Sequence, residues 1–275
     1  MKKFIFFLFL LPAFTANAQI GWEDFYSEKD LQSDLQYAKT PAEQLDATGC
    51  LAVHYKKIHT DSLAKVYIQK VFSIAENSKD VYLMARALWW DISYEGSVEK
   101  ANKLLQYAEQ HNLLKEKISA NLSLVDINIH QNLTLAEKYA LTAQNLLNQW
   151  KKDTIGKDSI KLEIYLRSAH TYIHKVDGVK TSRYLFLLQD YAVQNKNESL
   201  KIQAIDALET MYFEWGGQEK KAIPWLNKEY EYFKKTKQFN KLLGIVSALG
   251  MLYGKLGNKE QTKTYFNEFG KLQDS

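Results

Sequence analysis

Two histidines, His170 and His174, come closest to a spacing that could do chemistry in this sequence. Residues four apart on a helix share one face, and two imidazoles on one face can hold a metal ion. The zincin pattern also needs a glutamate directly after the first histidine, but Thr171 stands there, and the spacing suggests no third ligand. An exposed helix face is therefore the favoured interpretation, and we predict no metal site and no cofactor. The alternative is an enzyme built on helical hairpins with a metal at these histidines.

Other signatures of catalysis do not occur in the sequence. It has no Gly-x-Ser-x-Gly, no phosphate-loop pattern and no Gly-x-Gly-x-x-Gly, and the remaining histidines have no paired Asp or Ser motif. The single cysteine, Cys50, lies among Ala47, Leu51 and Val53, so we expect a buried and unreactive thiol. We predict that the protein is not an enzyme.

The composition favours a folded, helical protein. Apolar residues make up 46% and charged residues 25% of the 275 residues, which is ordinary for a globular chain and argues against disorder. There are only 3 prolines, and Leu, Ala, Lys, Glu and Gln, which favour helix, are abundant. The net charge of +4 is too small to indicate a nucleic-acid partner.

The first residues have the pattern of an export signal. Lys2 and Lys3 precede an apolar run from Phe4 to Leu11, and Ala16-Asn17-Ala18 is a small-x-small cleavage site. We therefore predict a signal peptide over residues 1–18 and a periplasmic or secreted mature protein. No later segment reaches the roughly 20 apolar residues of a membrane span, so none is predicted in the mature chain.

The clearest repeat lies near the end of the chain. Leu249-Gly250 is followed by Tyr253 one turn later and by Gly257, and Tyr265-Phe266 comes in the next helical segment. This pattern resembles the tetratricopeptide (TPR) family, in which a first helix carries Leu-Gly and Tyr, a Gly closes it, and a second helix carries an aromatic residue. The resemblance implies helical hairpins stacked in a row.

Weaker copies of the pattern precede the last one. The second helices of all six copies are anchored by small residues spaced 37, 35, 46, 40 and 40 positions apart, namely Ala64, Ala101, Ala136, Ser182, Ala222 and Thr262. The predicted fold is all-α, a right-handed superhelical solenoid of about six TPR-like helix pairs over residues 40–275. A lead-in helix within residues 19–39 is expected to cover the first pair.

Helix boundaries can be predicted independently of the repeats. Thr40 with Glu43, and Thr134 with Glu137, have the spacing of capping boxes, in which each side chain bonds the other residue's backbone N–H. Pro224 should kink or delay the helix that it enters, because proline has no backbone N–H.

In TPR proteins a partner usually lies in the groove lined by the first helix of each pair. The resemblance therefore implies a binding groove for a protein or peptide segment, basic and aromatic early in the chain and acidic late. Its predicted lining is Lys56, Lys57, Arg86, Trp90, Tyr94, Asn121, Asn128, Arg167, His174, Asp206, Phe213 and Glu214. Trp89 and Trp90 are adjacent, so only one of them can face the core.

Two functions fit this sequence. The first is an exported scaffold or adaptor that binds a partner in the groove. The alternative rests on the segments Asp30–Leu45 and Asp61–Ala64, which resemble the opening of extracytoplasmic TPR regions of bacterial sensor and regulatory proteins such as histidine kinases. The last repeat has no evident polar capping helix, and its apolar face also offers a surface for self-association.

Overall fold

The computed structural model describes residues 27–151, 155–194, 201–202, 204–205, 208, 211–212 and 219–273. The chain divides into two compact units, unit 1 up to Ile164 and unit 2 from Tyr165. The predicted signal peptide at residues 1–18 lies outside the described residues, as do Asp206, Phe213 and Glu214 of the predicted groove.

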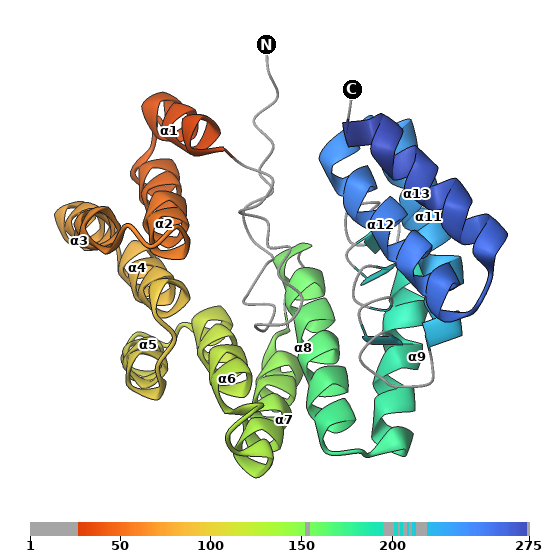
Figure 1. Ribbon diagram of the computed structural model, residues 1–275. Coiled ribbons are helices and arrows are strands. Elements are labelled where there is room, and N and C mark those ends of the chain that lie inside the picture. Colours follow the sequence, from red (N-terminus) through yellow and green to blue (C-terminus); the bar gives the residue numbers. More distant parts are fainter. Residues whose placement is uncertain are drawn as a thin grey trace. The chain divides into compact units, whose positions relative to one another are not determined.

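Every regular element in the described residues is a helix, which confirms the all-α class. Unit 1 contains α1 (Glu28–Tyr37), α2 (Pro41–Lys57), α3 (Asp61–Ser78), α4 (Val81–Tyr94), α5 (Val98–Gln110), α6 (Leu114–Asn128) and α7 (Leu133–Gln149), and the division between the units falls within α8 (Ile155–His174) (Figure 1). Among all the residues that the structure describes, no helix is both long enough and apolar enough to cross a membrane.

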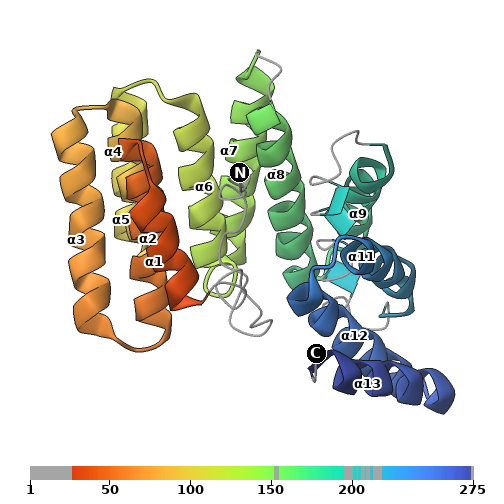
Figure 2. The same ribbon diagram turned by 90° about the horizontal axis from the view of Figure 1, so that it is seen from above.

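The helices of unit 1 pack as successive hairpins. The pairs α2–α3, α4–α5 and α6–α7 are in contact, and each second helix up to α5 also contacts the next first helix. Figure 1 shows the first helices α2, α4 and α6 along one side of the unit and the second helices α3, α5 and α7 along the other. Figure 2, seen from above, shows α2 and α3 lying side by side. Helix α1 lies within the predicted lead-in segment and packs on α2, where the Tyr55 hydroxyl donates to Glu28 Oε1 at 2.7 Å.

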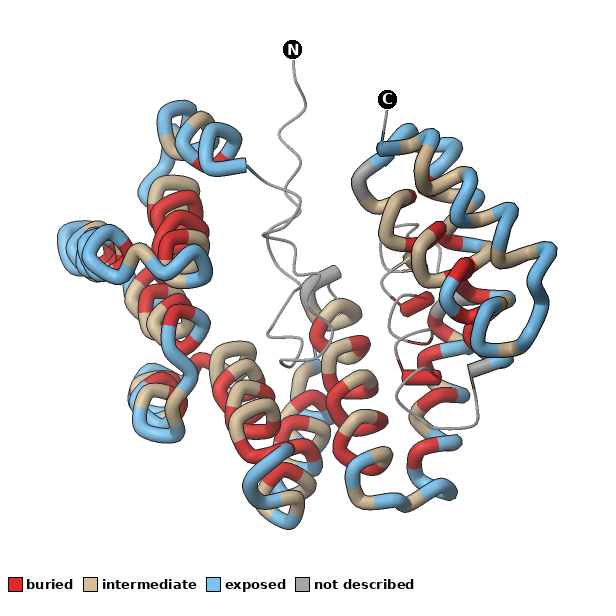
Figure 3. Tube along the Cα trace, in the orientation of Figure 1, coloured by how far each residue is buried: buried red, intermediate tan, exposed pale blue. Residues whose placement is uncertain are grey.

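Small residues allow the hairpins of unit 1 to close tightly. The predicted anchors Ala64, Ala101 and Ala136 are fully buried. Figure 3 shows in red the residues that are buried in the helices of this unit. The anchor predicted at Ser182 in unit 2 is wrong, because Ser182 is exposed and Thr181 is buried in its place. Thr181 satisfies its hydroxyl inside the helix by donating to the Asp177 carbonyl at 2.9 Å.

The start of α2 confirms the first predicted capping box. Thr40 Oγ1 accepts from the Glu43 backbone N–H at 3.2 Å, and Glu43 Oε2 accepts from the Thr40 N–H at 2.9 Å. The second box, predicted at Thr134, is wrong. Helix α7 begins two residues earlier, where Asn132 accepts from the Leu135 N–H at 3.1 Å.

Unit 2 continues with α9 (Gly178–Gln194), a 3₁₀ turn η2 (Glu219–Lys221), α11 (Ile223–Lys235), α12 (Phe239–Lys255) and α13 (Lys259–Gln273). Pro224 is the second residue of α11. The start of the helix is therefore delayed so that Pro224 lies in its first turn, where no backbone N–H is needed, as the sequence predicts.

The last hairpin, α12–α13, has the contacts that its sequence pattern implies. Leu249 is fully buried, and a Cβ on Gly250 would lie only 3.2 Å from the Phe266 ring, so the glycine brings the two helices close together. Tyr253 stacks on Tyr265 with ring centroids 5.7 Å apart. Phe266 nevertheless stays 44% exposed.

Candidate functional site

One face of α4 carries side chains toward solvent. Tyr82, Arg86, Trp89 and Ser93 follow one another at intervals of four, three and four residues, which places them along one line of the helix. Tyr82 is 61% exposed, Ser93 is exposed, Trp89 is half-buried, and the Arg86 side chain is 20% exposed. We call these four residues the α4 strip.

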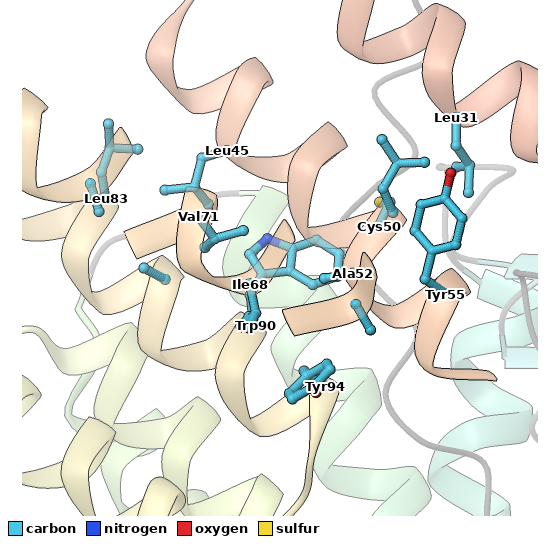
Figure 4. Packing of buried hydrophobic residues seen from close by; sticks show 14 residues of the cluster. Leu31, Leu45, Cys50, Ala52, Tyr55, Ile68, Val71, Leu83, Trp90 and Tyr94 are labelled. Atoms are coloured by element: carbon cyan, nitrogen blue, oxygen red, sulfur yellow. The ribbon is translucent and has the colours of Figure 1, made fainter. Parts of the chain in front are cut away.

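Trp90 lies on the core face of α4, and the prediction that it lines a groove is wrong. It is only 2% exposed and packs in the cluster that includes Leu45 and Val71 (Figure 4). Consecutive residues on a helix are about 100° apart, so the burial of Trp90 leaves Trp89 as the tryptophan on the α4 strip. The two indoles meet edge to face, with centroids 4.9 Å apart.

The Trp90 indole is seated by two residues of α2. Its Nε1–H donates to Asp46 Oδ1 at 3.2 Å, so the buried ring keeps its hydrogen bond. The indole ring lies over Gly49, where any Cβ would overlap the ring atoms Cγ, Cδ2 and Cε2. Gly49 is therefore the space into which Trp90 fits, and the contact ties α2 to α4.

Asp46 also forms an ion pair with Arg86 of the α4 strip. Burial raises the pKa of the Asp46 carboxyl, and Arg86, Trp90 and Lys115 only partly offset this effect. Formal charges of −1, +1 and +1 on Asp46, Arg86 and Lys115 leave this cluster with a net positive charge. The pair holds the Arg86 guanidinium at a fixed place beside the exposed part of the strip.

Lys56 and Tyr94, both predicted for the groove, meet at the other end of α4. The Tyr94 ring is buried, and two ammonium groups lie over it, Lys56 at 5.6 Å and Lys100 at 5.3 Å from its centroid. Lys56 Nζ bonds Asp61 at 3.1 Å, and this hydrogen bond raises the lysine pKa. Each charge here has a partner, so this cluster joins helices, and Tyr94 is not available as a groove residue.

Lys100 is anchored in the same way from the start of α5. Its Nζ lies 2.9 Å from Asp91 and 3.1 Å from Glu95. Burial lowers the pKa of Lys100, but the hydrogen bonds to the two carboxylates outweigh it and the net shift is upward. The same contact lowers the pKa of Glu95.

The predicted groove residues of α6 are buried. Asn121 and Asn128 turn back on their own helix, donating from Nδ2 to the carbonyls of Lys117 at 2.8 Å and Leu124 at 2.7 Å. Because α6 packs against both α5 and α7, these positions face neighbouring helices and not solvent. The prediction that they line a groove is wrong.

The remaining predicted residues do not form one site. Lys57 is exposed at the end of α2, and Arg167 is buried in α8, which contradicts its predicted place in a groove. His174 is exposed in the last turn of α8, with its Nε2 3.1 Å from His170 Nε2. In the described part of the chain, no three His, Cys, Asp or Glu side chains gather as metal ligands.

Sequence reasoning missed three residues that support the α4 strip, namely Asp46, Gly49 and Lys115. A signal for two of them is present. Residues 45–52 are mostly apolar or small in the sequence, and a carboxylate and a glycine inside such a run require a specific partner. Lys115 has no comparable signal, because nothing local marks its approach to Asp46.

Neither a comparison with protein-family models nor one with curated proteins finds a match for this chain. The inference of function therefore depends on the residues and geometry described above.

Proposed function

We propose that the protein is an exported interaction scaffold that binds a protein or peptide segment along the α4 strip. The observation that carries the proposal is the strip itself: an exposed tyrosine and a half-buried tryptophan flank an arginine that is held by an ion pair with the buried Asp46. Tyr, Trp and Arg are the residue types that contribute most to binding at protein interfaces. Export remains a proposal that rests on the pattern of residues 1–18.

Rigidity supports the same proposal. A side chain that is already ordered before binding loses less entropy when a partner arrives. Arg86 is held by Asp46, and Trp89 packs against both neighbouring core clusters, so these two residues are ordered in the unbound protein. The stacked hairpins place the strip on a helix and not on a loop, which fixes its geometry further.

The charge of the strip's surroundings indicates the kind of partner. Asp46, Arg86 and Lys115 sum to +1, and Tyr82 adds an aromatic surface with a hydroxyl. A segment with a carboxylate and an apolar or aromatic side chain would complement both features. We therefore propose an acidic, partly apolar segment as the ligand.

The test uses exposed residues, so that the fold is left intact. Tyr82→Ala combined with Ser93→Glu changes the strip without touching the core, and Tyr37→Ala removes a tyrosine of α1 that is equally exposed, at 60%. We expect partners captured from the organism's own extract by the wild-type protein to fall at least about tenfold with the double variant, the effect of about 1.4 kcal/mol. Tyr37→Ala should capture as much as wild type.

Equal capture by all three proteins would remove the α4 strip as the binding surface. A loss with Tyr37→Ala as large as that with the double variant would move the surface to α1. Far-UV circular dichroism of each variant separates loss of binding from loss of fold.

A further inference from the structure

The pair His170 and His174 has a geometry that spacing alone does not show, and this geometry revises the expectation from the sequence that the pair holds no metal ion. The two Nε2 atoms face each other at 3.1 Å, and the ring centroids are 4.8 Å apart. At this distance one ring donates a hydrogen bond from Nε2 and the other accepts it with its lone pair. Both rings therefore direct the same nitrogen to a single point on the surface of α8.

Two imidazoles that bind one metal ion need nearly the same separation. With a metal–nitrogen bond of about 2.0–2.1 Å, two ligands at 90° lie about 2.9 Å apart and two ligands at the tetrahedral angle about 3.3 Å apart. The 3.1 Å between the Nε2 atoms lies between these values. A metal ion can thus replace the shared proton with little movement of either ring.

The backbone beneath the pair is fixed before any metal arrives. The last turn of α8 closes with the Val176 N–H donating to the Ile173 carbonyl at 2.9 Å and the Asp177 N–H donating to the Tyr172 carbonyl at 3.0 Å. Tyr172 is buried and stacks on Tyr184 of α9, with centroids 5.7 Å apart. A ligand pair on a packed helix is held more accurately than one on a loop.

We propose that His170 and His174 form a binding site for one divalent late transition-metal ion, with water completing the coordination. Imidazole ligands suit Cu²⁺, Ni²⁺ and Zn²⁺, and among these Cu²⁺ binds most tightly to a given set of nitrogen ligands. The site lies within unit 2 and on one helix, so it is independent of the α4 strip and of the proposed scaffold function.

The experiment titrates the tag-free full chain with Cu²⁺, Ni²⁺ and Zn²⁺ against a colorimetric chelator. We expect one equivalent of Cu²⁺ to bind at this site, more tightly than Ni²⁺ or Zn²⁺. His170→Gln and His174→Gln should each weaken Cu²⁺ binding at least tenfold. His111→Gln, which replaces an exposed histidine of unit 1, should leave it unchanged.

A second variant tests geometry and not the number of histidines. His174→Gln combined with Lys175→His keeps two histidines but places them five residues apart, off the common face, and should bind Cu²⁺ as weakly as His174→Gln. Electron paramagnetic resonance of the wild-type Cu²⁺ complex should show two imidazole nitrogens. Wild-type affinity in either His→Gln variant, no Cu²⁺ binding by wild type, or a spectrum without imidazole nitrogen would overturn the proposal.

Discussion

Replacing Gly49 by alanine is a sharp test of how α2 and α4 are joined. In a helix alanine is ordinarily better than glycine by about 1 kcal/mol. At Gly49, however, the new methyl group would overlap the Trp90 indole, so the ring must move. Overpacking of this kind costs about 1–3 kcal/mol, and loss of the Trp90 hydrogen bond to the Asp46 carboxylate costs about 1.5–3 kcal/mol. With the gain in helix propensity subtracted, we expect Gly49→Ala to lower the free energy of unfolding by about 1.5–5 kcal/mol in total.

The matched control is Gly270→Ala. Gly270 is also helical, in α13, but a Cβ there meets nothing within 4 Å. The same substitution should raise stability by about 0.5–1 kcal/mol through helix propensity alone. Urea unfolding followed by circular dichroism and tryptophan fluorescence measures both variants.

A double-variant cycle shows whether Trp90 is the cause. In a Trp90→Ala background the space over Gly49 is open, so adding Gly49→Ala should stabilise that protein by about 1 kcal/mol. If Gly49→Ala is as stable as wild type in the native background, the indole does not sit on Gly49, and the account of how α2 and α4 are joined is wrong.

Further substitutions test other contacts by urea unfolding. Asp46→Leu should cost about 2–3 kcal/mol because it leaves both the half-buried Arg86 and the buried Trp90 N–H without their carboxylate partner. Asp46→Leu with Arg86→Met should recover the part of that loss that comes from Arg86, while the part from Trp90 stays. A double variant no better than the single would contradict the ion pair's role. Burial raises the pKa of Asp46, so the folded protein binds this proton more tightly than the unfolded chain does. The contribution of Asp46 protonation to the free energy of unfolding is therefore fully present below about pH 4 and is lost as pH rises through the folded pKa. Asp46→Asn should lack this dependence between pH 4 and 8. Thr40→Ala should cost about 1 kcal/mol by removing the cap of α2, and an unchanged midpoint would refute the cap. Tyr55→Phe should cost about 1 kcal/mol by removing the bond to Glu28 and should speed proteolysis of α1; unchanged cleavage would show that this bond does not hold α1.

The helices and their pairing could be predicted because their signals are local. Apolar periodicity, the cap at Thr40 and the glycine in Leu249-Gly250 each act within a few residues, and each appears in the structure where the sequence predicts it. Small residues such as Ala64 and Ala101 mark the close contacts between helices for the same reason.

The errors in the candidate site are mostly errors of rotation. Moving one position along a helix turns the side chain by about 100°, which exchanges core for solvent. Trp90 and Trp89 differ in this way, as do Thr181 and Ser182. Sequence pattern determines the helix more firmly than it determines this angle, because the angle is set by the neighbouring helices.

The ion pair could not be predicted, because it is not local. Asp46 and Arg86 are forty residues apart, and only the stacking of α2 beside α4 brings them together. A buried carboxylate indicates that some partner exists, but the sequence does not say which residue it is.

The most direct test of the binding proposal is photocrosslinking from a defined side chain. A photoreactive phenylalanine analogue at position 82 lies on the α4 strip, and the same group at position 37 is equally exposed on α1. We predict that position 82, but not position 37, yields a discrete protein adduct in cells of the source organism, and that an excess of unlabelled wild-type protein abolishes the adduct. Equal adducts from both positions, or none from position 82, would contradict the proposal that this protein binds its partner through the α4 strip.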